Sequence, residues 1–182
     1  MKIDVDQKIV GDISQQLIDN LLNAIDEEDW YVADYRQSVK SMNHTNSIMI
    51  HHTPLCASGR YDMETITSIS KQPLYDKFIP LVQPILDELK KYYDFNQYAC
   101  FMARLRPGGI ITEHVDKGSF LELCNRVHVP LKSNPKVRYV IDGTSYYWET
   151  GKIYEFNNTK MHGVYNESDE YRIHLVINLY KI

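Results

Sequence analysis

The sequence predicts a mainly β protein with flanking helices, in which the strands close into a barrel or jelly roll. The second half of the chain contains many short runs with strand-like alternation at regular spacing. Turn signals separate these runs, among them Pro107-Gly108-Gly109 and Asp142-Gly143. The first half instead carries two stretches in which apolar residues recur at helical spacing. Together these patterns favour a β core that helices support from outside.

The first half is expected to contain two helices and one strand. Residues 12–26 place their apolar side chains on one face of a helix, and residues 47–52 have the pattern of a short strand. Residues 73–93 have the apolar stripe of a second helix. Pro80 and Pro84 are expected to break or kink the start of this helix, because proline removes a backbone donor and clashes with the preceding turn.

The second half is expected to supply the strands of the core. They are predicted over residues 98–106, 110–116, 126–131, 136–141, 145–148, 152–156 and 172–180. In the last strand, one face is apolar and the other carries Arg172, His174 and Asn178. Residues 126–131 alternate in the same way, with Arg126 and His128 on the polar face. In a barrel, these two Arg-x-His strands would line one polar, cationic cavity.

Composition limits the class of protein. The chain has 182 residues, of which 43% are hydrophobic and 24% charged, as in an ordinary globular domain. A formal net charge of −4 provides no basic field for nucleic acid. No apolar run approaches the ~20 residues that a membrane span needs, and the first residues lack the apolar core of a signal peptide. Three cysteines without a C-x-x-C spacing indicate neither a disulfide framework nor a zinc knuckle. We therefore expect a cytoplasmic protein.

A His-x-Asp motif and a distant histidine are the most informative residues. His114 and Asp116 lie two apart, so on an extended strand their side chains point the same way. With His162 they complete a two-histidine, one-carboxylate set, which can hold Fe(II) and leave positions open for oxygen and a co-substrate. His-x-Asp alone is a common dipeptide, and it could equally be a surface loop after the turn. Zn(II) could also use these ligands, leaving one position for hydrolysis.

Two arginines on the polar strand faces could bind carboxylates. Arg172 follows His162 in the chain and could supply the cation for a dicarboxylate co-substrate, because a guanidinium matches a carboxylate bidentately. The alternative is an exposed arginine paired with Asp169 or Glu170. Arg126 could bind a carboxylate of the co-substrate or of the substrate, or could simply face solvent.

Further histidines and arginines carry weaker signals. His128 and His174 could hydrogen-bond to carboxylates or to groups around the site, although a single histidine is more often structural. His51-His52 could contact substrate, but a solvated strand end is the simpler interpretation. Arg104 and Arg106 share a strand face, where either could be a structural ion-pair partner.

Three stretches of the second half together resemble the aspartyl/asparaginyl β-hydroxylase family, and within it the bacterial free-proline cis-hydroxylases. They are ARLRPGGIITEHVD, NRVHVPLKSNPKVRYVIDG and ETGKIYEFNNTKMHGVYNESDEYRIHLVINLY. The resemblance implies a double-stranded β-helix (a cupin-like jelly roll) and an Fe(II)- and 2-oxoglutarate-dependent dioxygenase. Their ordered combination is much more specific than any single motif.

Matching the family's motifs residue by residue assigns the expected roles. The match assigns iron binding to His114, Asp116 and His162, and it assigns binding of the far carboxylate of 2-oxoglutarate to Arg172. It assigns binding of another carboxylate to Arg126, and His128 matches the family's histidine in the R-x-H-x-P strand. Animal aspartyl hydroxylases lack the carboxylate ligand, so Asp116 places the chain nearer the proline-type branch.

The sequence is therefore expected to encode one domain over residues 1–182, with a supporting region at 1–97 and a catalytic jelly-roll core at 98–182. The expected reaction is hydroxylation of a carbon of an amino acid or a peptidyl residue, with O2 consumed, 2-oxoglutarate decarboxylated to succinate, and ascorbate as a helpful reductant. Two alternatives stay open at this point. One is a cupin-like module that binds a metal or a carboxylate without turnover, and the other is a zinc hydrolase.

Overall fold

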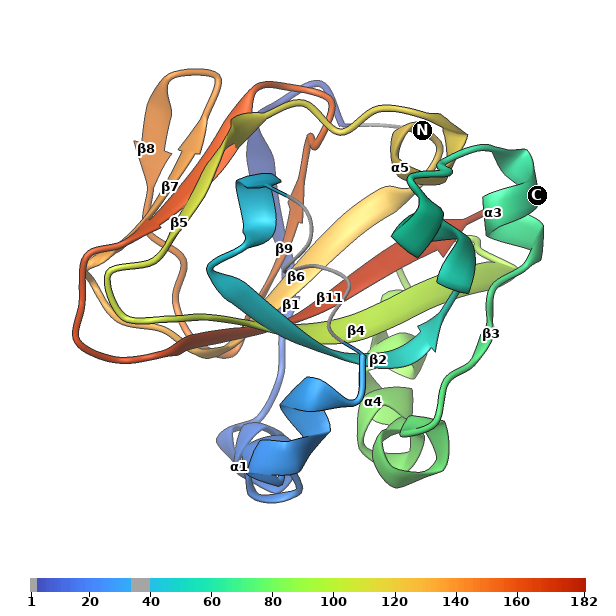
Figure 1. Ribbon diagram of the computed structural model, residues 1–182, viewed down its shortest axis with the longest axis horizontal. Helices are drawn as coiled ribbons and strands as arrows, with labels where there is room; N and C mark the ends of the chain where they lie inside the picture. Colours follow the sequence, from blue (N-terminus) through green and yellow to red (C-terminus); the bar gives the residue numbers. More distant parts are fainter. Residues whose placement is uncertain (1–2, 34–39) are drawn as a thin grey trace.

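Two antiparallel β-sheets form the core of the computed structural model, which describes residues 3–33 and 40–182 (Figure 1). The larger sheet has the strand order β1-β9-β6-β11-β4-β2-β3, and the smaller has the order β5-β10-β7-β8. Strands that are distant in sequence are therefore neighbours in space, as in a jelly roll. The predicted fold class, a double-stranded β-helix with flanking helices, is confirmed.

The strands of the larger sheet are β1 (Gln7–Asp12), β2 (Thr45–His52), β3 (Ser70–Lys71), β4 (Gln97–Leu105), β6 (Asn125–Lys132), β9 (Lys152–Phe156) and β11 (Arg172–Tyr180). Those of the smaller sheet are β5 (Ile110–His114), β7 (Val137–Ile141), β8 (Thr144–Tyr146) and β10 (His162–Asn166). The α-helices are α1 (Gln15–Asn23), α3 (Met63–Thr67), α4 (Tyr75–Leu89) and α5 (Ser119–Glu122). Short 3₁₀ turns are η1 (Glu27–Tyr31), η2 (Lys40–Met42) and η3 (Pro54–Ser58).

All seven strands expected in the second half are present, and several elements were missed. The sequence did not reveal β10, which is short and contains Gly163, nor β1, which ends at Asp12, the first residue assigned to the first helix. The helix α1 therefore begins only after Ser14, whose side chain accepts a hydrogen bond from the Leu17 amide.

The expected break in the second helix is wrong. The helix α4 runs without interruption through Pro80 and Pro84, both of which are exposed. Prolines four residues apart lie on one helix face, so the carbonyls that lose their partners face water. The opposite face buries Phe78, Val82 and Ile85 against the sheet, and this packing holds the helix together.

The helices α1 and α4 cover the outer face of the larger sheet (Figure 1). The side chains of β6 and β11 that pack there are apolar, namely Val127, Val129, Leu131, Leu175, Ile177 and Leu179. Because side chains alternate along a strand, Arg126, His128, Arg172 and His174 lie on the opposite, inner face. The alternation predicted for both strands is therefore confirmed.

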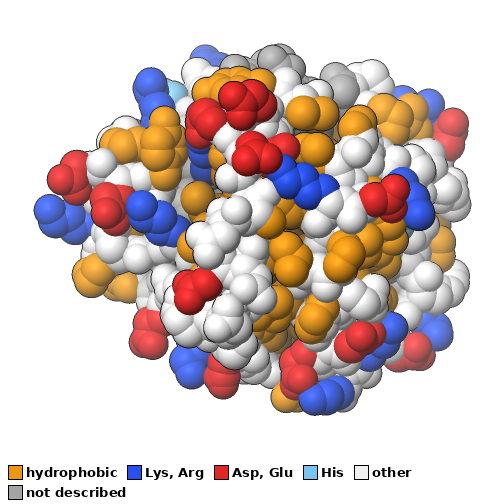
Figure 2. Space-filling model, turned by 90° about the horizontal axis from the view of Figure 1, so that it is seen from below, with side chains coloured by type: hydrophobic (Ala, Val, Ile, Leu, Met, Phe, Trp, Pro, Cys, Tyr) orange, Lys and Arg blue, Asp and Glu red, His pale blue; other side chains and the backbone are white. Residues whose placement is uncertain are grey.

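The helical side of the molecule carries acidic and basic side chains that are interspersed between apolar ones (Figure 2). This mixture agrees with the small net charge of −4. Among the described residues, none of the helices is long and apolar enough to cross a membrane.

Candidate functional site

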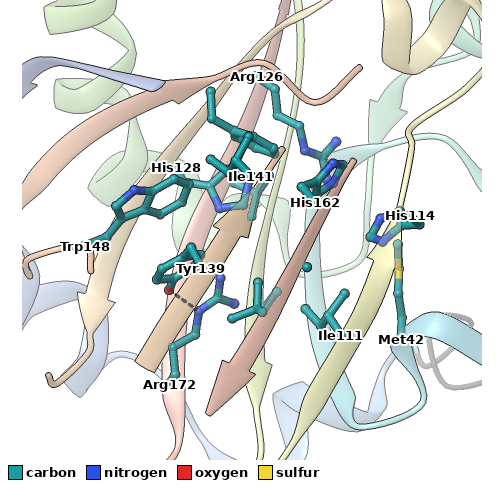
Figure 3. A pocket seen from close by; sticks show the side chains of 15 residues that line it. Met42, Ile111, His114, Arg126, His128, Tyr139, Ile141, Trp148, His162 and Arg172 are labelled. Carbon is teal, nitrogen blue, oxygen red and sulfur yellow. Dashed lines mark hydrogen bonds between the residues drawn. The ribbon is translucent and has the colours of Figure 1, made fainter. Parts of the chain in front are cut away.

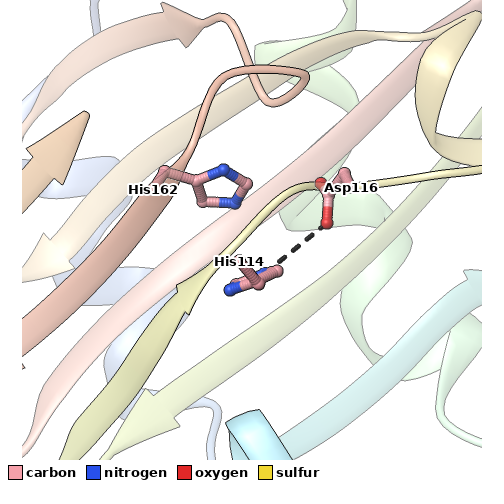
Figure 4. A group of neighbouring side chains, drawn as sticks. All are labelled: His114, Asp116 and His162. Carbon is pink, nitrogen blue, oxygen red and sulfur yellow. Dashed lines mark ion pairs between the residues drawn. The ribbon is translucent and has the colours of Figure 1, made fainter. Parts of the chain in front are cut away.

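Two strands of the smaller sheet bring the two histidines of the motif together. His114 ends β5 and His162 begins β10, and the antiparallel register places the two residues directly opposite each other. An irregularity in this pairing lies between His162 and Val164, where Gly163 sits. Asp116 follows two residues after His114, and one ligand atom from each of the three side chains lies within 4.8 Å of the others (Figure 4).

Backbone hydrogen bonds set the tautomers of both histidines. Nδ1 of His114 lies 2.8 Å from the carbonyl oxygen of Thr112, and Nδ1 of His162 lies 2.8 Å from that of Lys160. A carbonyl oxygen can only accept, so each Nδ1 carries the proton. Each Nε2 therefore keeps its lone pair for a metal, in the way that metal-binding histidines are commonly oriented.

The third ligand candidate, Asp116, is held as a buried carboxylate. Its Oδ2 accepts a hydrogen bond of 2.9 Å from Asn158 Nδ2 and lies 3.7 Å from Arg126 Nε. Burial alone would raise the pKa of Asp116, but the neighbouring Arg126, His114 and His162 outweigh it and hold the pKa below its usual range. Asp116 is therefore ionised at neutral pH.

His162, unlike Asp116, is held in its uncharged form. Burial lowers the pKa of His162 to about 4, so the imidazole is neutral at physiological pH. Neutral imidazoles and an ionised carboxylate are the protonation states that metal binding requires. The three side chains thus fit a divalent metal, and their donor set is the one that suits Fe(II).

A pocket of about 550 Å³, part of it open to solvent, extends from the histidines between the two sheets (Figure 3). Arg172 lies in its wall at only 2% exposure, and its Nε donates a 2.9 Å hydrogen bond to the Tyr139 hydroxyl. The alternative of an exposed Arg172 paired with Asp169 or Glu170 is therefore wrong. Apolar walls and one buried cation at a distance from the metal ligands suit a small dicarboxylate.

Arg126 and His128 also reach this pocket. Arg126 is buried beside Asp116, and its Nη1 donates to Asn178 Oδ1 at 3.2 Å. His128 packs edge-on against the rings of Trp148 and Phe156. The structure therefore brings together all six residues that the sequence singled out, which are His114, Asp116, His162, Arg172, Arg126 and His128.

A second pocket of about 410 Å³ adjoins the first and shares Arg126 and Met42 with it. Asp116 and Asn178 supply polar groups to its wall, and Phe101 and Phe120 supply aromatic surface. His52 lines it as well and is only 2% exposed. For His52, the interpretation as a solvated strand end is therefore wrong, because its ring packs against the rings of Phe101 and Phe120.

Arg104 has the structural role that was considered for it. Its two terminal nitrogens donate to Glu27 at 2.7 Å each, and its guanidinium lies over the Trp30 ring. Arg106, two residues on, is exposed. Neither residue lines the two pockets at the histidines.

Sequence reasoning gave no role to three residues of the site. Tyr139 contacts Arg172, Asn158 holds Asp116, and Asn178 holds Arg126. The alternation of β7 could have placed Tyr139 on the inner face, between Val137 and Ile141. Asn178 stood on the polar face of the last strand, whereas Asn158 lies in a turn that gives no such pattern.

Solved structures of two prolyl hydroxylases share this fold. The prolyl-4-hydroxylase of Pseudomonas putida is 13% identical, with a TM-score of 0.57 over 97% of this chain and 91% of that one. The viral collagen prolyl hydroxylase of Paramecium bursaria Chlorella virus-1 is also 13% identical, with a TM-score of 0.55 over 98% of both chains. No curated protein matches this chain by sequence.

The aspartyl/asparaginyl beta-hydroxylase family matches residues 22–181, which is most of the chain and includes every candidate site residue. This match confirms the resemblance seen in the three sequence stretches and extends it into the first half. The chain belongs to the aspartyl/asparaginyl beta-hydroxylase family and is a 2-oxoglutarate-dependent hydroxylase whose cofactor is Fe(II).

Proposed function

We propose that the protein hydroxylates a carbon of an amino acid or of a peptidyl residue. In this reaction one oxygen atom of O2 enters succinate as 2-oxoglutarate loses CO2, and the other oxygen atom is inserted into a C–H bond of the substrate. Fe(II), when bound, supplies the redox chemistry that couples O2 to the decarboxylation. The observation that carries the proposal is the adjacency of the His114, Asp116 and His162 cluster to a pocket with a buried arginine.

His114, Asp116 and His162 are proposed to hold the metal. The tautomers of the two histidines support this role, because each Nε2 is left as an acceptor. Asn158 and Arg126 support it for Asp116, since they orient the carboxylate and keep it ionised.

Arg172 is proposed to bind the distal carboxylate of 2-oxoglutarate. Its burial in the pocket wall supports this role, because an arginine so placed needs an anion to offset the loss of hydration. His128 and Arg126, which also line the pocket, are proposed to contact a carboxylate of the co-substrate or of the substrate.

The second pocket is proposed to hold the side chain or the backbone of the substrate. It meets the first pocket at Arg126, so a molecule there would lie beside the metal ligand Asp116. Asn178 Nδ2 is buried in this region without a partner at hydrogen-bond geometry and offers a donor to a substrate oxygen. The prolyl substrates named for the two structural neighbours make free and peptidyl proline the first compounds to test.

A substrate screen tests the proposal. The protein is incubated with Fe(II), ascorbate and 2-oxoglutarate together with free amino acids, proline among them, and with short peptides. Mass spectrometry should find one substrate that gains one oxygen atom, with an equal amount of succinate formed. His162→Ala should remain folded and form neither product. A folded wild-type protein that binds no Fe(II) would refute the proposal.

A further inference from the structure

A chain of hydrogen bonds crosses the buried wall of the first pocket and joins Arg172 to His128, two of the three residues proposed to contact carboxylates there. Arg172 Nε donates to the Tyr139 hydroxyl at 2.9 Å, and that hydroxyl lies 2.8 Å from His174 Nε2. Nδ1 of His174 lies 3.3 Å from Nδ1 of His128. We call these four residues the polar chain. It links β11, β7 and β6, and His174 at its centre is fully buried.

The chemistry of its members gives the polar chain one direction. Arginine can only donate, so the phenol oxygen of Tyr139 accepts from Arg172. Burial raises the pKa of Tyr139, and the neighbouring Arg172 guanidinium acts against this rise. With Arg172 donating to the oxygen, the hydroxyl proton goes to His174 Nε2, which lies 2.8 Å away. His174 then carries its proton on Nδ1 and donates it to His128 Nδ1.

His174 differs from the other three residues of the polar chain in its position relative to the pocket. Tyr139, His128 and Arg172 line the pocket, whereas His174 does not and contacts the pocket through them. Figure 3 shows the bond from Arg172 to Tyr139, with the rest of the guanidinium turned toward the pocket. An imidazole that is fully buried with both ring nitrogens engaged fixes the orientation of its two partners.

We propose that His174 is a positioning residue which, through Tyr139, fixes the Arg172 guanidinium for the distal carboxylate of 2-oxoglutarate and, through its other nitrogen, fixes His128. This inference rests on the proposed binding of that carboxylate by Arg172. It predicts that the two nitrogens of His174 serve opposite ends of the co-substrate, so removing one or the other has different effects.

Two substitutions separate the two nitrogens. Glutamine can present an oxygen near the position of Nε2, so His174→Gln keeps the acceptor for Tyr139 and loses the donor to His128. Asparagine can present a nitrogen near the position of Nδ1, so His174→Asn keeps the donor and loses the acceptor. Leu175→Ala is the matched control, because Leu175 is equally buried on the same strand but faces the helices.

The measurement is the binding of two 2-oxo acids to the Fe(II)-loaded protein without oxygen. Pyruvate retains the 2-oxo acid end of 2-oxoglutarate and lacks the distal carboxylate. The ratio of the dissociation constant of pyruvate to that of 2-oxoglutarate therefore reports on binding at the Arg172 end. We expect His174→Asn to reduce this ratio about five- to tenfold, the effect of losing one buried hydrogen bond. His174→Gln should weaken both acids alike and leave the ratio unchanged, and Leu175→Ala should change neither.

An unchanged ratio in His174→Asn, or an equal fall in both His174 variants, would overturn the inference. The proposed function is tested separately by Arg172→Gln, which should abolish most of the preference for 2-oxoglutarate. If it does not, Arg172 has no role at the distal carboxylate, and both proposals fail at that point.

The tautomer of His174 provides a test that needs no variant and no co-substrate. Nitrogen NMR of the wild-type protein, loaded with diamagnetic Zn(II) in place of Fe(II), should find His174 protonated on Nδ1 and His128 protonated on Nε2. A His174 ring protonated on Nε2 would reverse the chain and refute its proposed direction.

Discussion

At the scale of single residues, the site depends on how each ligand candidate is held. Carbonyl oxygens two residues earlier in the chain accept from His114 and His162, and Asn158 donates to Asp116. These contacts leave one acceptor atom of each ligand candidate for a metal. Asp116 matters most for the branch of the family, because it separates a three-ligand centre from a two-histidine one.

Asp116→Ala tests the three-ligand centre. We expect hydroxylation to be lost, because the variant removes one metal ligand and leaves the buried Arg126 without its neighbouring carboxylate. Iron binding by the purified variant and its activity at saturating Fe(II) are the measurements. Retained activity would indicate that two histidines are sufficient. Asp116→Asn, which keeps the shape of the side chain, is the control for packing.

Arg172→Gln tests the distal carboxylate site. A hydrogen bond to a charged group contributes about 1.5–3 kcal/mol, so the KM for 2-oxoglutarate should rise by roughly 10- to 150-fold. The kcat at saturating 2-oxoglutarate should fall much less, because Arg172 lies away from the metal ligands. Steady-state kinetics of succinate formation give both values. An unchanged KM would exclude Arg172 from co-substrate binding.

At the scale of elements, β5 and β10 form the part of the fold on which the metal site depends. Their register sets His162 opposite His114, and Gly163 marks the irregularity next to that pair. A Cβ on Gly163 would lie 2.8 Å from Glu113 Cγ and 3.0 Å from the Ile111 carbonyl oxygen. Because the second of these atoms is backbone, the two strands would have to move apart.

Gly163→Ala should therefore reduce the free energy of Fe(II) binding by more than it reduces the free energy of unfolding. We expect a fall of about tenfold or more in Fe(II) affinity, as follows when a ligand-orienting contact is lost. Ile85→Ala on α4 is the matched comparison. It should cost about 2–5 kcal/mol of unfolding free energy and leave iron affinity unchanged, because α4 packs on the outer face of the other sheet. Equal losses of iron affinity in both variants would contradict this assignment.

The elements also show what the sequence could predict. Clean alternation in residues 126–131 and 172–180 was enough to identify both polar faces, and thereby Arg126, His128 and Arg172. By contrast, β10 was missed because its five residues, HGVYN, combine glycine with polar side chains and carry no strand pattern. The partners Tyr139 and Asn158 lie 33 and 42 residues from Arg172 and Asp116, and they lie in another sheet and in a turn, so only the tertiary fold brings them into contact.

At the scale of the whole molecule, the polar interior makes stability depend on pH. Burial, Arg172 and His128 hold the pKa of His174 well below its usual 6.5. The unfolded chain therefore binds a proton near pH 6.5 that the folded protein resists. Because the unfolded state binds more protons below this pH, the stability of the fold falls as the pH is lowered.

Unfolding by urea at pH 7.5 and at pH 5.0 measures this effect in the metal-free protein. His174 should contribute a loss of about 1.4 kcal/mol for each pH unit below 6.5, down to the folded pKa. His174→Gln should show a smaller difference between the two pH values than the wild type. The same difference in both proteins would mean that His174 is not the group that resists protonation.

The central claim is that one site holds both Fe(II) and 2-oxoglutarate, and it can be tested without knowing the substrate. Under exclusion of oxygen, 2-oxoglutarate is titrated into the protein with one equivalent of Fe(II), and the visible absorption is recorded. We predict a charge-transfer band that requires both components, that is absent in His162→Ala, and that appears only at higher 2-oxoglutarate concentrations in Arg172→Gln. A wild type that binds iron without developing the band, or a band that persists in His162→Ala, would contradict the claim.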